Sequence, residues 1–409
     1  MKQNLYHNIA VNLLDASFFG FALGFASFST IIPLFFATMT DSALIIGLIP
    51  AIHNMGWQFP QLFTARKIGQ LAYLKPYVLQ NTIHERLPFL GFALIAFALP
   101  ALGIKAGITL ALILLIWQGI GSGFAANGWQ ILISKVIPSS RLTTFFGFQS
   151  ALFNLCASVA AIASGILLER LGQHFGFTAC FLIACVMFTI SWFGLYSTRE
   201  PERKLGDVAT NEAPIVTRTV QIIRSNRSFL WYIIARNLSH FGLMASAFYI
   251  VYAVKYYGVS KSTAGLLTSV LMASQTLATL FLGWLSDHWS KKWVLIIGMI
   301  FTALAPLLAA FVHTDQGFYP IFVLTGISNT VLFLSMAYAL NFGNTEEKPL
   351  YVGIANTLIA PSTILAPVLG GWLADVYGYP VTFLFAAAAA FLTTLLLIAF
   401  VSEPSKNGT

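Results

Sequence analysis

The chain of 409 residues is 57% hydrophobic and only 9% charged, and its mean hydropathy is +0.79. Soluble domains carry about 25% charged and about 45–50% apolar residues, so this composition excludes a water-soluble globule and a disordered chain, and we expect no nucleic-acid binding. The formal net charge of +8 comes from 22 Lys and Arg against 14 Asp and Glu.

Apolar runs long enough to cross a bilayer recur along the whole chain. A membrane-spanning helix needs about 20 mainly apolar residues, and this length accommodates twelve such helices with short loops. No small-residue cleavage site follows the first run, so we expect it to be retained rather than removed as a signal peptide. The predicted spans are 9–37, 43–63, 76–103, 107–135, 143–168, 175–196, 229–256, 262–286, 293–313, 318–342, 351–374 and 380–401.

One long polar stretch divides these spans into two sets of six. We predict an N-terminal six-helix bundle (1–197), a cytoplasmic linker (198–228) and a C-terminal six-helix bundle with a short cytoplasmic tail (229–409). The two halves resemble each other weakly, and Gly172 between spans five and six has a counterpart in Gly378 between spans eleven and twelve. Transporters built from two parallel halves bind their substrate near the membrane midplane, between the halves.

The distribution of Lys and Arg predicts the orientation, because cytoplasmic loops carry an excess of these residues. With the N-terminus inside, sixteen of the 22 basic residues fall on the cytoplasmic side, and Arg86 and Arg236 lie within spans. We therefore predict a multi-pass protein of the bacterial plasma (inner) membrane with both termini in the cytoplasm. The basic residues on the opposite side are Lys105, Arg170, Lys255 and Lys261.

The loop between spans eight and nine carries the most specific motif. Gly283, Asp287, Lys291 and Lys292 have the spacing of the cytoplasmic G-x-x-x-D-[RK]-x-G-[RK]-[RK] loop of the major facilitator superfamily. The chain resembles this family over nearly its whole length. The resemblance implies an all-α membrane protein of two six-helix bundles related by a pseudo-twofold axis, working as a transporter and not as an enzyme.

Both copies of this loop depart from the family pattern. His288 and Ser290 replace a basic residue and a glycine, and in the first half Ala65 replaces the aspartate. In the family the aspartate binds a neighbouring helix end, and the basic residues hold the cytoplasmic gate shut. Lys291 and Lys292 could instead be plain positive-inside anchors. The gating residues implied by the resemblance are Arg66, Lys67, Gly283, Asp287, Lys291 and Lys292.

Asp15 is a charged residue inside the first span. A charge at the bilayer centre is costly, so an intramembrane ionisable group is a functional candidate. One interpretation is a protonatable coupling site, because burial disfavours the charged form of a carboxyl group. The other is a helix-capping or helix-linking carboxylate near the interface, about a turn and a half inside a helix that starts near Ile9.

Glu85 and Arg86 lie about 15 Å into the third span at 1.5 Å per residue. Pro88 follows them and predicts a kink, which brings water or free carbonyl groups near. Adjacent residues on a helix point in different directions, so each of the two needs a partner on another helix. The pair is either a structural charge network, or a proton relay or conformational switch.

Arg236 lies in the seventh span, with His240 one helical turn further on. A permanently charged guanidinium there suits a substrate carboxylate or phosphate, or an acidic partner such as Asp15. It could also extend to the cytoplasmic interface. His240 could titrate near neutral pH or be a packed, hydrogen-bonded histidine. The candidate proton-coupling residues are therefore Asp15, Glu85 and His240.

The resemblance places spans one, four, seven and ten around a central cavity, and these spans carry amides and aromatic side chains. Such a mixed surface suits amphipathic organic molecules, although polar residues also join helices in lipid. The 14% aromatic content favours an apolar or aromatic cargo over a sugar. The candidate cavity residues are Asn12, Gln118, Asn127, Trp129, Gln130, Arg236, Asn329 and Tyr338.

Three functions remain open. The first is proton-coupled efflux, by antiport and alternating access, of a small amphipathic organic molecule. The second is uptake of an organic anion, with Arg236 as counter-charge, and the third is a lipid-handling or receptor role. The sequence contains no Walker or dinucleotide-binding motif, so we expect no ATP-driven pumping, cofactor or metal. We expect a monomer whose partners are its substrate, protons and the lipid bilayer.

Overall fold

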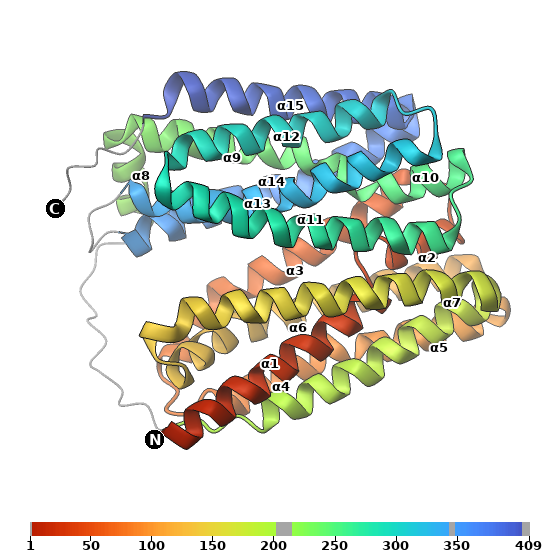
Figure 1. Ribbon diagram of the computed structural model, residues 1–409, viewed down its shortest axis with the longest axis horizontal. Helices are drawn as coiled ribbons and strands as arrows, with labels where there is room; N and C mark the ends of the chain where they lie inside the picture. The colour runs from red at the N-terminus through yellow and green to blue at the C-terminus, as the bar shows by residue number, and fades with distance from the viewer. Residues whose placement is uncertain (1, 202–214, 343–347, 403–409) are drawn as a thin grey trace. The chain divides into compact units, whose positions relative to one another are not determined.

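The computed structural model describes residues 2–201, 215–342 and 348–402, and these residues form helices and connecting loops without strands (Figure 1). Each of the twelve predicted spans lies mainly on helix. The helices are α1 (Lys2–Phe25), α2 (Ile31–Ala37), α3 (Ala43–Gly69), α4 (Lys75–Arg86), α5 (Pro88–Leu102), α6 (Ile104–Val136), α7 (Ser139–Tyr196), α8 (Ile215–Ser225), α9 (Arg227–Leu243), α10 (Tyr249–Tyr257), α11 (Lys261–His288), α12 (Lys291–Ala310), α13 (Phe318–Tyr338), α14 (Lys348–Tyr377) and α15 (Tyr379–Phe400), with short 3-10 helices at Met244–Ala247, Asp315–Gly317 and Ala339–Asn341.

Nine stretches among the described residues are helical, long and apolar enough to cross a membrane. One of them, Thr144–Tyr196, contains two predicted spans, because α7 includes a sharp bend at Gly172, whose φ is +72° and ψ 179°. Gly378, its predicted counterpart, has φ +87° and ψ 160° and directly precedes α15. Only glycine adopts this backbone region readily. The correspondence between Gly172 and Gly378 in the sequence is therefore matched by a similar backbone conformation at the two positions.

The first predicted span is not one helix. α1 ends at Phe25, and α2 begins at Ile31 after a non-helical stretch. Ser27 Oγ lies 2.8 Å from Ser29 Oγ and also accepts the Ser29 backbone N–H at 3.2 Å. Short hydroxyl side chains offer such local alternatives to the helical backbone bonds, and they explain the break that the hydropathy pattern did not show.

The third span is interrupted where the sequence predicts a kink. α4 ends at Arg86 and α5 begins at Pro88, with Leu87 between them. Proline lacks a backbone N–H and disfavours continuation of the helix that precedes it. The interruption places Glu85 and Arg86 at the end of a helix segment, inside the span.

The chain divides into two compact units, and we describe each by itself. Unit 1 comprises Met1–Gly206 and Ile250–Ala273, and unit 2 comprises Asp207–Tyr249 and Ser274–Thr409. In unit 1, α1 packs along α7 and α3 along α6; in unit 2, α15 packs against α9 and α12 (Figure 1). The division into bundles at 198–228 stays a prediction, and α8 lies within that predicted linker.

Candidate functional site

Asp15 lies in the middle of α1, deeper than the sequence predicts. The helix begins at Lys2 rather than near Ile9, and the apolar stretch Asn4–Phe25 has Asp15 at its centre. The residue is only 5% exposed. Its Oδ1 accepts hydrogen bonds from the Ser191 hydroxyl of α7 at 2.5 Å and from Arg86 Nη2 at 3.1 Å. Asp15 therefore binds side chains of two other helices and does not cap a helix end.

Arg86 is the partner of Asp15, and the pair is buried. The guanidinium is 7% exposed, and its Nη2 also contacts the Ser191 hydroxyl at 3.1 Å. It lies 5.5 Å from the centre of the Phe19 ring, a favourable position for a cation. Its Nε and Nη1 are buried and have no hydrogen-bond partner among the described residues. The expectation that Arg86 needs a partner on another helix is confirmed, but the guanidinium retains unused donors.

Glu85 adds a second carboxylate to the same cluster. It lies within electrostatic reach of both Arg86 and Asp15, and its hydrogen-bond neighbour is Ser122 of α6. The backbones of α4 and α6 come into close contact here, because a Cβ atom on Gly121 would overlap the backbone of His84 and Glu85. Two carboxylates and one guanidinium thus share a small region of unit 1, and we call Asp15, Glu85 and Arg86 the charge cluster.

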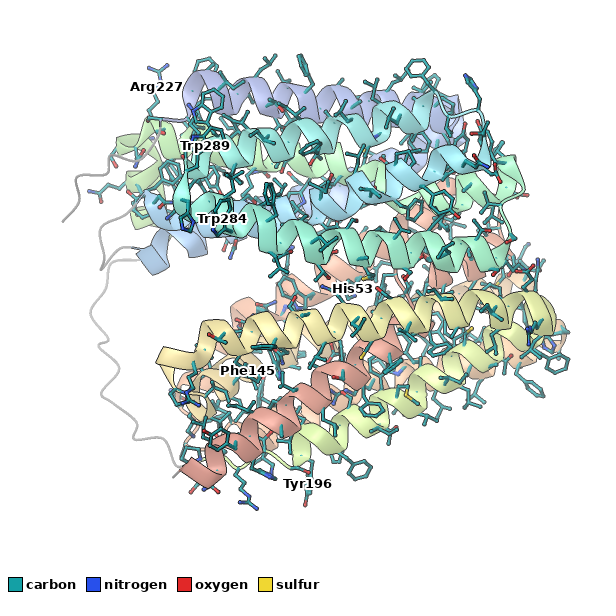
Figure 2. The ribbon with its side chains drawn as sticks, viewed as in Figure 1. His53, Phe145, Tyr196, Arg227, Trp284 and Trp289 are labelled. Carbon is teal, nitrogen blue, oxygen red and sulfur yellow. The ribbon has the colours of Figure 1, made fainter. Side chains whose placement is uncertain are left out.

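A second polar group in unit 1 was missed by the sequence analysis. His53 of α3 forms a hydrogen bond between its Nδ1 and Oε1 of Gln118 at 3.0 Å. The His53 ring also stacks on Phe28 with 4.1 Å between ring centroids. Figure 2 shows His53 on α3. The predicted cavity residue Gln118 is thereby joined to an aromatic pair. Its spacing in the sequence could not indicate this, since residues 53 and 118 lie on different helices.

Arg236 belongs to unit 2, where its Nη2 donates to Asn356 Oδ1 of α14 at 3.0 Å. It is 4% exposed, so it does not extend to the interface. Asp15, which the sequence analysis offered as its acidic partner, is paired with Arg86 instead. His240, one turn along α9, has a buried Nε2 with no hydrogen-bond partner within the described parts of the chain.

The remaining predicted cavity residues have diverse surroundings. Asn12 is fully buried and donates to Asn8 O at 2.8 Å and Thr198 Oγ1 at 3.0 Å, which is a helix-joining role. Tyr338 is 2% exposed and packs in the core of unit 2. Gln130 is exposed. The others bond or pack against neighbouring helices: Asn127 with Gln61 O at 3.0 Å, Asn329 with Gln275 Oε1 at 3.4 Å, and Trp129 with Phe146.

The predicted gating residues are described only in part. The side chains of Arg66, Lys67 and Asp287 lie outside those that the structure describes. Lys291 Nζ donates to Asn341 Oδ1 and Lys292 Nζ to Ile398 O, each at 3.2 Å. Both lysines therefore bond within unit 2, which is compatible with a gate and with an anchor. A Cβ atom on Gly283 would meet nothing within 4 Å.

Comparison with known proteins decides the family. The model of the Major Facilitator Superfamily matches residues 78–252 and again residues 233–409. The chain belongs to the Major Facilitator Superfamily. It is thus a multi-pass membrane protein and a secondary transporter that acts on a small molecule, not an enzyme, and the resemblance seen in the sequence is confirmed.

Three known proteins are similar to part of the chain. The quinolone resistance protein NorA of Staphylococcus aureus is 26% identical over 157 residues, or 38% of this chain and 40% of NorA. Multidrug resistance protein 1 of Bacillus subtilis is 25% identical over 150 residues, 36% of this chain and 38% of that protein. An uncharacterised superfamily transporter of Methanocaldococcus jannaschii is 29% identical over 140 residues, 34% of this chain and 36% of that protein. The matches thus span about two fifths or less of these relatives.

Solved structures match over nearly the whole chain. The nucleoside transporter NupG has a TM-score of 0.75 at 12% identity, covering 97% of this chain and 100% of NupG. A D-xylose-proton symporter has a TM-score of 0.73 at 15% identity, covering 99% of both chains. At such low identity these likenesses show the fold alone. They confirm the predicted all-α membrane fold of the superfamily.

Proposed function

We propose that this superfamily member is a proton-coupled exporter of small amphipathic organic molecules, working by alternating access in a bacterial inner membrane. The observation that carries the proposal is the charge cluster, in which the buried guanidinium of Arg86 pairs with Asp15 near the middle of α1 and the carboxylate of Glu85 lies within electrostatic reach of both. With both carboxylates ionised, the cluster has one uncompensated negative charge. One bound proton makes it neutral.

The cost of burying charge determines when the charge cluster binds a proton. An unpaired charge inside a membrane protein is expensive, whereas a neutral, hydrogen-bonded cluster is tolerated. The cluster therefore favours taking up one proton whenever it is closed off from water, and it can release that proton when water reaches it. Such a proton exchange is the requirement for coupling transport to a proton gradient. In this proposal the charge of Arg86 compensates one of the two carboxylate charges, and Asp15 or Glu85 accepts the proton.

The surroundings of His53 support an amphipathic cargo. The stacked rings of Phe28 and His53 provide an aromatic surface, and Gln118 beside them provides hydrogen-bonding groups. Aromatic faces combined with a few polar groups are typical of sites for organic molecules. The names of NorA and Multidrug resistance protein 1 point in the same direction, since both proteins confer resistance to drugs.

The decisive experiment uses purified protein in proteoliposomes that contain a pH-sensitive dye. Amphipathic neutral and cationic compounds, added one at a time, should drive proton movement through the wild-type protein, and organic anions should not. Asp15→Asn should abolish gradient-driven transport yet retain exchange of labelled substrate, because the amide keeps the size of the side chain but cannot titrate. Arg141→Gln, at an exposed position of α7, is the control and should behave as wild type.

Three results would contradict the proposal. Full gradient-driven transport by both Asp15→Asn and Glu85→Gln would remove the charge cluster from coupling, and His240 would remain as the titratable candidate. Proton movement driven only by organic anions would favour the uptake carrier. Lack of transport for every compound of the panel, with lipid movement instead, would favour the lipid-handling role.

The proposed orientation has its own test. A cysteine introduced at the exposed position Arg227 should react with a membrane-impermeant reagent only from the cytoplasmic side, and one at Lys105 only from outside. The excess of Lys and Arg in the predicted cytoplasmic loops is the reason. Labelling of the Arg227 position from outside would invert the topology.

A further inference from the structure

The core of unit 2 contains a positive charge without a negative partner. Arg236 is 4% exposed, and its one hydrogen-bond partner among the described residues is the neutral side chain of Asn356. Within the described residues, no carboxylate lies within 4.0 Å of this guanidinium. The buried or half-buried cations Arg86 and Lys135 of unit 1 differ, since Arg86 pairs with Asp15 at 3.1 Å and Lys135 with Glu200 at 2.7 Å. Arg236 therefore needs a counter-charge that the described part of the chain does not supply.

A small cavity lies beside this guanidinium. It has a volume of about 10 Å³, which is room for one water-sized occupant. Arg236 lines it from α9, together with apolar side chains of α12 and α15. Four residues that carry a hydroxyl group also line it: Tyr232, Ser239, Ser335 and Thr393.

The hydrogen-bond donors of the lining residues differ in whether they already have an acceptor. Tyr232 OH donates to Ser335 O, and the Ser239 hydroxyl donates to Arg236 O at 2.7 Å. The hydroxyls of Ser335 and Thr393 donate to Leu332 O and Ala389 O at 2.7 and 2.9 Å. The protons of all four hydroxyls are thus committed to backbone carbonyls. Nε and Nη1 of Arg236, in contrast, are buried and without a partner in the described chain. An occupant that contacts Arg236 must therefore accept hydrogen bonds.

We propose that this cavity in unit 2 is a binding site for a single small inorganic anion, chloride, held by the guanidinium of Arg236. An anion satisfies the unused N–H groups and neutralises the buried charge at the same time, whereas a water molecule would do only the first. The size of the cavity favours a monoatomic anion over a carboxylate. The site is separate from the charge cluster of unit 1, and the inference does not depend on the coupling proposal.

The first test measures binding through stability, without transport. The melting temperature of the purified protein should rise by several degrees when gluconate is replaced by chloride at equal ionic strength, because a ligand that binds only the folded state stabilises it. Arg236→Gln should weaken the apparent chloride affinity at least tenfold. Arg227→Gln makes the same substitution at an exposed position at the start of the same helix (Figure 2), and it should keep the wild-type response.

A second measurement keeps the proposal testable if Arg236→Gln does not fold. Crystals grown in bromide should show an anomalous scattering peak beside Arg236 in the wild-type protein, and Arg236→Lys, which keeps the charge, should retain a chloride response. Equal melting temperatures in chloride and gluconate, or a bromide map without a peak at Arg236, would overturn the proposal. A stronger response to acetate than to chloride would also overturn it, and would assign the site to a carboxylate.

Discussion

Removing the charge of Arg86 alone should destabilise the protein more than removing the charges of Arg86 and Asp15 together. Both residues are buried, at 7% and 5% exposure, and their ion pair is 3.1 Å long. Arg86→Gln leaves the Asp15 carboxylate with the Ser191 hydroxyl but without a positive neighbour at hydrogen-bond distance. Breaking a buried pair in this way costs about 3–5 kcal/mol, whereas replacing the whole pair by neutral groups is often close to neutral.

The size of the expected recovery follows from this contrast. The double variant Arg86→Gln, Asp15→Asn places two amides where the ion pair was, and the amides can bond to each other and to Ser191. We therefore expect the double variant to regain most of the about 3–5 kcal/mol that Arg86→Gln loses. Glu85, the third residue of the charge cluster, is unchanged in both variants, so its contribution cancels in part from the comparison.

Unfolding in detergent, followed by thermal melting and by denaturant titration, measures the effect. The four proteins of the cycle are the wild type, the two single variants and the double variant. Arg141→Gln, which removes an exposed charge, is the control and should change the free energy of unfolding little. A double variant that is destabilised by the full sum of the single variants would refute the reasoning, because the two side chains would then not neutralise each other.

Three further predictions concern single contacts in unit 1. Gly121→Val should cost at least about 1–3 kcal/mol, since its Cβ atom would overlap the backbone of α4, whereas a Cβ atom at the exposed Gly147 would meet nothing within 4 Å, so Gly147→Val should melt near the wild type. Gly172→Ala should lower stability by about 1–3 kcal/mol, because φ at this position is +72°; an unchanged melting temperature would exclude that conformation. Lys255 lowers the pKa of Asp41 below its ordinary value of 3.8, so this contact is fully present above that pH and is lost only as the pH falls through the lowered pKa. Wild type and Lys255→Gln should accordingly converge in stability only in strong acid, and convergence near neutral pH would contradict this.

Hydropathy alone determined the helical architecture, and charge asymmetry alone predicted the orientation. Each predicted span lies mainly on helix because the bilayer requires about 20 apolar residues with satisfied backbone groups. Pro88 located the interruption after Arg86, since the effect of proline on the backbone is local. The break between α1 and α2 was missed, because it depends on hydroxyl–backbone contacts that leave the hydropathy pattern unchanged.

Only the tertiary structure decided which polar side chains meet. The sequence indicated that Arg86 needs a partner on another helix, but Asp15 lies 71 residues before it in the chain and Ser191 lies 105 residues after it. A helix that is apolar on all sides carries no stripe to indicate its rotation, so spacing along the chain cannot predict which face meets a neighbour. The same reason explains why His53 was missed and why Arg236 proved to be buried against Asn356 instead of extending to the interface. Local chemistry determined the helices of this protein, and the packing between helices determined its sites.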